Sequence, residues 1–288
     1  MSVRLHPDSA QRAHHYRHLI ARWRTVARAA GVTLRPLAAV GEFTVYYLEN
    51  PAAWQRRGAG SGGGGFYASA GIHGDEVGGT EGLLAWAQAD LAKWNVAGRE
   101  RPFFLVPCLN PWGLTNNRRV AADGTDLNRI FHRNAPAPVG ELMRLLARRR
   151  FVLALTLHED YDAQGLYLYE LSPRAELDLG EQLLDTARAL DFPVDTRRTI
   201  EVRRVTRLGL LRMRRNAALR LLKIPAEAIW LYQHVARQVF TIETPSEFSL
   251  SARAALQARL MRTCLEQLEA RTPQGFTGTS AIGEACGK

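Results

Sequence analysis

Residues 66–93, FYASAGIHGDEVGGTEGLLAWAQADLAK, form the first complete strand-and-helix unit that the sequence predicts. The apolar run at 66–72 has the length of a buried strand, and apolar residues recur at helical spacing over 80–93. Gly74 lies in the turn between the two elements, where it allows the backbone to fold tightly. A strand that leads directly into a helix is typical of an α/β protein.

Further strand-and-helix units follow along the chain. Before the first unit lie a helix at 7–30, ended by Gly31, and a β-rich stretch at 43–48. The pattern predicts an α/β fold with a mixed, mostly parallel central sheet flanked by helices and an added N-terminal helix. We expect an N-terminal helical extension at 1–35, a main domain at 36–272 and a loosely ordered tail at 273–288. The other predicted strands are 103–107, 151–157, 166–169 and 238–243, and the other predicted helices are 139–149, 174–190, 226–237 and 249–270.

The composition is that of an ordinary globular protein, with 288 residues of which 46% are hydrophobic and 23% charged. No apolar run approaches the roughly 20 residues that cross a bilayer, and no signal segment begins the chain. We therefore expect a cytoplasmic protein without a membrane partner. The 3 cysteines are odd in number and widely spaced, so neither a disulfide framework nor a thiolate zinc site is indicated.

The net charge of +10 could indicate a nucleic-acid partner. However, its densest stretches, 144–150 and 197–215, lack the interleaved aromatic residues that stack on bases, so we expect no nucleic-acid partner. The stretch 197–215 is either a solvated loop or a basic rim that attracts acidic substrates. A glycine run at 58–65 contains GxGxxG, but it precedes a strand instead of following one, which excludes a dinucleotide site.

Ligand-type residues come at the ends of three predicted strands. His73 and Glu76 follow the first, His158 follows the strand at 151–157, and Glu243 closes the last. Two imidazoles and one carboxylate leave zinc an open position for water, and a second carboxylate can accept the proton of that water. Taken singly, each residue also has a structural interpretation, such as a hydrogen-bonded histidine or a helix cap. Their joint order favours one zinc ion per chain, held by His73, Glu76 and His158, with Glu243 as the base.

Five segments occur in one order: GIHGDEVGGTEGLL at 71–84, NPWGL at 110–114, RRVAADGTDLNRIF at 118–131, LTLHED at 155–160 and FTIETPSEF at 240–248. Together they resemble the zinc carboxypeptidases of the M14 type and their relatives, the succinylglutamate desuccinylases and aspartoacylases. The resemblance spans most of the chain between residues 71 and 248, and it implies the zinc carboxypeptidase-like fold.

The resemblance also implies roles for individual residues. Asp126 matches the carboxylate that orients a ligand histidine. Arg119 matches an arginine that faces the developing oxyanion, and Arg118 competes for the same role. Asn128 and Arg129 match the pair that binds the terminal carboxylate of the substrate. For the three arginines, the other interpretation is plain surface charge.

The implied activity is that of a zinc-dependent metallocarboxypeptidase, which hydrolyses a C-terminal amide bond of a peptide through a metal-activated water. The alternative is an N-acyl amino acid amidohydrolase of the succinylglutamate desuccinylase/aspartoacylase type. TIETP at 241–245 is similar to the peptidase branch, whereas DLNRIF at 126–131 and LHEDYDAQGLYLY at 157–169 are similar to the acylase branch. The mobile tyrosine of carboxypeptidases is absent at 219–223, and Tyr232 is interpreted as a core or helix-face residue. A binding protein on a decayed hydrolase scaffold is disfavoured, because every metal and base position is present. The oligomeric state is left open.

Overall fold

A mixed sheet forms the centre of the protein. The computed structural model describes residues 12–56, 64–96, 102–173, 178–200, 203–214 and 225–270. Within them, eight strands follow the order β1-β2-β4-β3-β5-β10-β6-β9, with parallel pairing from β4 through β10. The predicted fold is confirmed. The strands are β1 (Leu34–Val40), β2 (Phe43–Glu49), β3 (Gly65–Ala70), β4 (Phe103–Val106), β5 (Phe151–Asp160), β6 (Tyr167–Ser172), β9 (Leu210–Arg214) and β10 (Ala236–Pro245).

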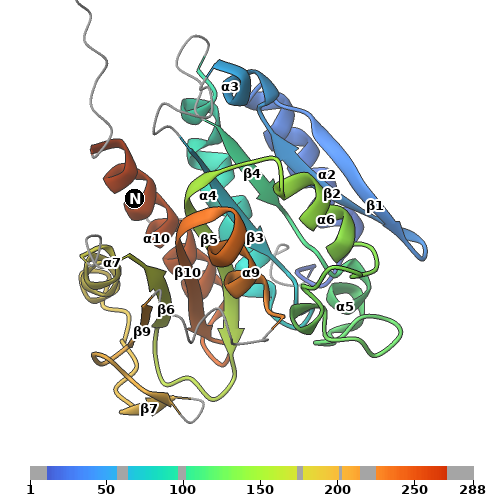
Figure 1. Ribbon diagram of the computed structural model, residues 1–288. Coiled ribbons are helices and arrows are strands. Elements are labelled where there is room, and N and C mark those ends of the chain that lie inside the picture. Colours follow the sequence, from blue (N-terminus) through green and yellow to red (C-terminus); the bar gives the residue numbers. More distant parts are fainter. Residues whose placement is uncertain are drawn as a thin grey trace, which may run out of the picture.

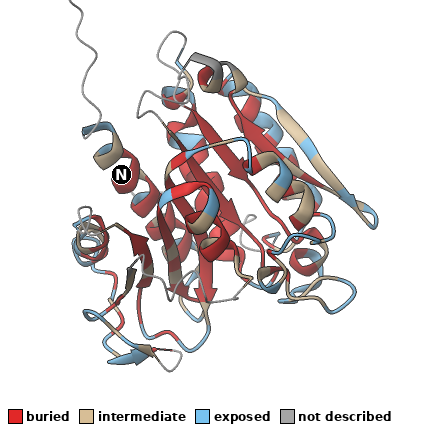
Figure 2. Cartoon of the chain, in the orientation of Figure 1, coloured by how far each residue is buried: buried red, intermediate tan, exposed pale blue. Residues whose placement is uncertain are grey.

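Helices cover both faces of the sheet, so that its central strands are buried (Figures 1 and 2). Parallel strands buried on both faces are rich in apolar residues, and β3 is buried along its whole length. One face packs against α2 (Tyr16–Ala29), α4 (Val77–Trp94), α7 (Leu179–Arg188) and α10 (Leu250–Ala270), and the other against α6 (Val139–Leu146) and α9 (Glu227–His234).

The N-terminal helix α2 is fastened to the main body by an ion pair and by its apolar side. Arg22 donates hydrogen bonds of 2.7 and 2.9 Å to the two carboxylate oxygens of Glu81 on α4, and Trp23 is fully buried. His15 caps the helix by accepting the N–H of His18. The predicted boundary at residue 35 falls inside β1, and the division into an extension, a domain and a tail stays a prediction.

Several short elements escape the sequence pattern. Strand β1 contains Pro36 at a register shift and lies at the sheet edge, where proline is tolerated but the alternation of apolar residues is weak. In the described part of the arginine-rich stretch at 197–215, three strands are present. Residues 58–63 of the glycine run at 58–65, and the whole predicted tail at 273–288, lie outside the described residues. The remaining elements are α3 (Pro51–Arg56), α5 (Pro111–Asn116), η1 (Leu127–Arg129), β7 (Thr199–Ile200) and β8 (Arg203–Arg204).

Strands β5 and β10 are longer than predicted, and this places two candidate residues inside the sheet. His158 and Glu243 are direct register partners on these parallel neighbours. Their side chains therefore emerge on the same face, next to each other. Among the described helices, none is both long enough and apolar enough to cross a membrane.

Candidate metal centre

The turn between β3 and α4 carries His73 and Glu76, and its shape depends on Gly74. The Gly74 N–H donates to the carbonyl oxygen of Arg118 at 3.1 Å. A Cβ at this position would lie only 1.9 Å from the carbonyl carbon of Gly113, so no side chain fits. Asn110 caps α5 by accepting the Gly113 N–H at 2.9 Å, which fixes the backbone that Gly74 packs against. The segments 71–84 and 110–118, far apart in the sequence, thus pack backbone against backbone.

His73, Glu76 and His158 form one buried cluster. Nδ1 of His73 lies 2.5 Å from Oε1 of Glu76, and Nδ1 of His158 lies 2.8 Å from Oε2 of the same carboxylate. The three offer ligand atoms that all lie within 4.8 Å of one another, and each residue is at most 6% exposed. Two imidazoles beside one carboxylate are a donor set that suits a divalent transition metal such as zinc.

The electrostatics of the metal-free cluster are those of imidazolium groups around a carboxylate. Burial lowers the pKa of His73, but the charge of Glu76 and the hydrogen bonds to Asp126 and Glu76 outweigh burial and raise that pKa to about 9. Burial raises the pKa of Glu76, but the two histidines outweigh burial and lower that pKa to about 2. A buried charge cluster of this kind persists because the opposite charges compensate one another. A divalent cation would take the place of the protons.

Asp126 orients His73 from the far side of its ring. Oδ1 of Asp126 lies 3.3 Å from Nε2 of His73 and also accepts the backbone N–H of Asn128 at 2.9 Å. This contact engages Nε2 and leaves Nδ1 directed at Glu76, where a metal would bind. The pKa of Asp126 is lowered, because His73 and Arg119 outweigh the effect of burial.

The two adjacent arginines differ in what they contact. The guanidinium of Arg119 donates to Oδ2 of Asp126 at 3.2 Å and lies 3.5 Å from Oε1 of Glu76. Arg118 is exposed, and its backbone carbonyl oxygen accepts the Gly74 N–H. The geometry therefore brings Arg119 to the cluster.

The predicted base lies beside this cluster, and the predicted carboxylate-binding pair lies in η1, directly after Asp126. Glu243 is half-buried opposite His158, and its charge contributes to raising the pKa of His158. Asn128 accepts the backbone N–H of Glu227 at 2.9 Å. Arg129 is exposed and donates to the carbonyl oxygen of Asn128 at 3.0 Å, and the described contacts do not join its guanidinium to the metal cluster.

Glu227, the first residue of α9, is a site neighbour that sequence reasoning missed. Its side chain is fully buried, Tyr67 donates to its Oε1 at 2.5 Å, and its Oε2 has no hydrogen-bond partner in the described part of the chain. Burial raises the pKa of Glu227, while Tyr67, Ser69 and the charges of His158 and His73 act to lower it. In sequence it is indistinguishable from an exposed first-turn glutamate. Tyr232 is buried in α9, as its interpretation as a core residue predicts, and 219–223 lie outside the described residues.

Residues 63–197 match the succinylglutamate desuccinylase/aspartoacylase catalytic domain family. No curated protein matches the sequence significantly. A crystal structure named "Putative metallopeptidase" from Shewanella baltica OS155 has 23% identity and a TM-score of 0.75, over 88% of this chain and 93% of that one. A metallo-carboxypeptidase from Burkholderia cenocepacia has 15% identity and a TM-score of 0.61, over 90% of this chain and 70% of that one. Carboxypeptidase A from Helicoverpa armigera has 14% identity and a TM-score of 0.57, over 90% and 74%. The structural likenesses show the fold, and with the family match they confirm the predicted resemblance.

Proposed function

We propose that this protein is a zinc-dependent hydrolase of amide bonds, because residues 63–197 match the succinylglutamate desuccinylase/aspartoacylase catalytic domain family and the fold is similar to that of a metallo-carboxypeptidase. The observation that carries the proposal is the buried cluster of His73, Glu76 and His158, with Glu243 as the register neighbour of His158. Three such ligands leave a coordination position on zinc for water, and Glu243 would supply a carboxylate beside that water.

Zinc bound to one site per chain would polarise the scissile carbonyl group and lower the pKa of a water molecule toward about 7. Glu243 would take the proton of that water and deliver it to the leaving amine, which is the usual task of a carboxylate general base and acid. Arg119, whose guanidinium already lies 3.5 Å from Glu76, would face the developing oxyanion. Asp126 would hold His73 in the tautomer that presents Nδ1.

The substrate is proposed to be a peptide with a free C-terminal carboxylate, from which the last residue is removed. Asn128 and Arg129, with Arg118 nearby, would bind that carboxylate at the rim of the site. A guanidinium suits this task, because its planar fork matches the two carboxylate oxygens. The attachment of Asn128 to the start of α9 supports the assignment, since it holds the amide in a fixed position beside the cluster.

A second candidate is the hydrolysis of an N-acyl amino acid, and the family match over residues 63–197 favours it. The same metal ligands and the same base would carry out this hydrolysis. The two activities differ in what lies on the acyl side of the bond, because a peptidase releases an amino acid from a chain, whereas an acylase releases a free acid.

The two candidates are separated by mass spectrometry of the products. The zinc-loaded protein and its Glu243→Gln variant are incubated with a mixture of peptides and N-acyl amino acids, after the zinc content of both has been measured. Shortened peptides with the wild-type protein alone would establish a carboxypeptidase, and free acyl groups would establish an acylase. Near wild-type turnover by Glu243→Gln with zinc bound would overturn the proposed mechanism.

A further inference from the structure

Behind the metal cluster, a buried polar network connects α10 with the strands that carry His158 and Glu243. Nε2 of Gln257 donates to the carbonyl oxygen of His158 at 3.1 Å and to the hydroxyl of Thr244 at 2.8 Å. Gln257 and Thr244 are fully buried. One amide group thus holds the backbone of a predicted metal ligand and the side chain that follows the predicted base.

Arg253, one turn earlier on α10, reaches the same strands through Glu159. Its guanidinium donates to Oε1 of Glu159 at 2.5 Å. Oε2 of Glu159 accepts the backbone N–H of Gly78 at 2.7 Å. The backbone N–H of Glu159 donates to Oε2 of Glu76 at 3.2 Å. The contacts form a continuous path from α10 to the carboxylate at the centre of the metal cluster.

Glycines of α4 lie where this helix passes close to β5 and to α10. A Cβ at Gly78 would lie 2.1 Å from Oε1 of Glu159, and a Cβ at Gly82 would lie 2.7 Å from Cβ of Gln257. These contacts explain Gly78 and Gly82, which follow shortly after the HxxE motif at 73–76. The close approach brings the side chains of α10 to the backs of the strands β5 and β10.

We propose that Gln257 and Arg253 are positioning residues, which hold His158 and Glu76 at the distances that metal binding requires and keep Glu243 beside His158. This inference rests on the proposed function. Metal ligands need to be held within about 0.5 Å of their productive geometry by neighbours whose own conformations are fixed. Gln257 acts on the backbone of His158, and Arg253 acts through Glu159 on Glu76, so neither touches the metal or the substrate.

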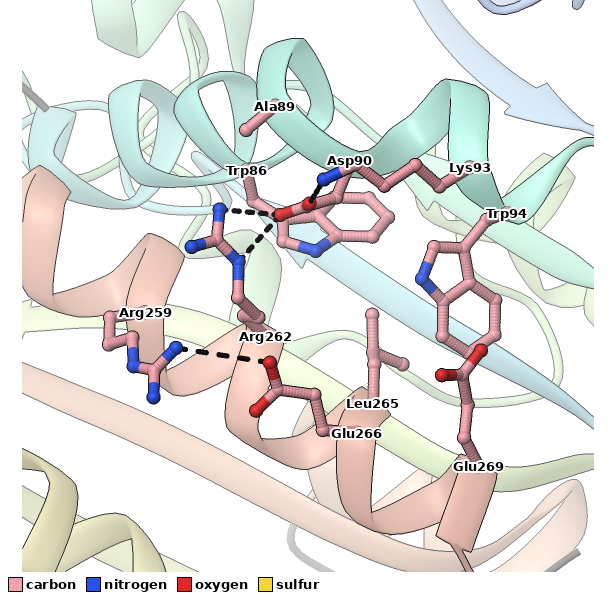
Figure 3. A pocket seen from close by; sticks show the side chains of 10 residues that line it. All are labelled: Trp86, Ala89, Asp90, Lys93, Trp94, Arg259, Arg262, Leu265, Glu266 and Glu269. Atoms are coloured by element: carbon pink, nitrogen blue, oxygen red, sulfur yellow. Dashed lines mark hydrogen bonds and ion pairs between the residues drawn. The ribbon is translucent and has the colours of Figure 1, made fainter. Parts of the chain in front are cut away.

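The same pair of helices offers a matched control farther along α10. There Arg262 donates to Asp90 of α4 at 2.8 Å, and Lys93 donates to the same carboxylate at 2.6 Å (Figure 3). These residues line a pocket of about 700 Å³ beside Trp86. The ion pair joins α4 to α10, as the Arg253 network does, but it contacts none of the predicted metal-site residues. Arg262→Met therefore shows how zinc affinity responds when the contact between α4 and α10 is weakened away from the metal site.

The test measures zinc affinity by competition with a chelating dye for the wild type and for Gln257→Met, Arg253→Met and Arg262→Met. Methionine preserves the length of the side chain and removes its hydrogen-bond donors. We expect about 10- to 100-fold weaker zinc binding for the first two variants and wild-type affinity for Arg262→Met. Thermal unfolding of the metal-free proteins shows whether the three variants are destabilised alike.

Thr244→Val removes the hydroxyl from the other end of the Gln257 contact and tests the same link if Gln257→Met does not fold. Where both fold, the double variant should lose less zinc affinity than the two single variants combined, because both changes break the contact between Gln257 and Thr244. Zinc affinities of the Gln257, Arg253 and Thr244 variants within about twofold of the wild type would overturn the inference. A wild-type protein that binds no zinc would instead overturn the proposed function.

Discussion

Zinc should bind this protein far more weakly in acid than at neutral pH, because the pKa values of both ligand histidines are raised in the metal-free protein. The pKa of His73 is about 9, and that of His158 is also raised above 6.5 by Glu76 despite the opposing effect of burial. A metal needs neutral imidazole, so each histidine has to release its proton before it binds. Glu76, with a pKa of about 2, is already ionised.

The size of the effect follows from the pKa of His73. At pH 7, about one molecule in 100 has this imidazole neutral, which corresponds to a cost of about 3 kcal/mol in zinc binding. At pH values where both histidines are protonated, zinc affinity should fall about 100-fold for each unit by which the pH is lowered. The stability of the metal-free protein should change in the opposite direction. A raised histidine pKa stabilises the fold below pH 6.5, and this contribution is lost as the pH rises through about 9.

The measurement is a competition titration with a chromophoric chelator at several pH values from acid to neutral. It is combined with calorimetry in two buffers of different ionisation enthalpy. The calorimetry counts the protons that zinc releases, and we expect between one and two at neutral pH. Asp126→Asn is the control, because it removes a carboxylate that raises the pKa of His73 and should reduce the proton release. Zinc affinity that does not change with pH, or a binding enthalpy independent of the buffer, would refute the reasoning.

Three further predictions concern stability. Gly74→Ala should prevent zinc binding or folding, because its Cβ would overlap the backbone of Gly113. In Gly124→Ala the new Cβ meets no atom within 4 Å, so the free energy of unfolding should fall by only about 1 kcal/mol. Circular dichroism melting of both variants checks this. Arg22→Met should lower the free energy of unfolding by about 3 kcal/mol or more, since it leaves the buried Glu81 unpaired, and a urea titration showing a loss below about 1 kcal/mol would contradict this. The raised pKa of Glu227 should destabilise the wild type as the pH rises above 4.5, and Glu227→Gln should flatten this dependence in urea titrations at several pH values. Equal slopes for the two proteins would show that Glu227 does not titrate as expected.

The central elements were predictable because their signals are local. A short apolar run followed by helical spacing identified β3 and α4, and the longer units after them were found in the same way. The edge strand β1 and the short helix α5 were missed. Strand β1 is only partly buried, and α5 is a single capped segment of 6 residues, so neither has enough periodicity to show.

The candidate metal ligands were also readable from the sequence. His73 and Glu76 lie three positions apart on one turn, so their proximity is local, and His158 follows from the rule that strand ends of a parallel sheet meet at one edge. The structure brings the three together as predicted. Their roles, and those of Glu243, Arg119, Asn128 and Arg129, stay predictions until the variants are measured.

The amino-acid order thus settled the fold class and a candidate metal cluster, because apolar periodicity and strand ends depend on neighbours along the chain. Only the folded structure distinguished Arg119 from Arg118, since adjacent residues of the same type differ solely in where their side chains point. It also revealed the buried Glu227 and the contacts of Gln257 and Arg253. These depend on α9 and α10 packing against strands that are distant in sequence, and burial and hydrogen bonding between distant segments leave no local pattern.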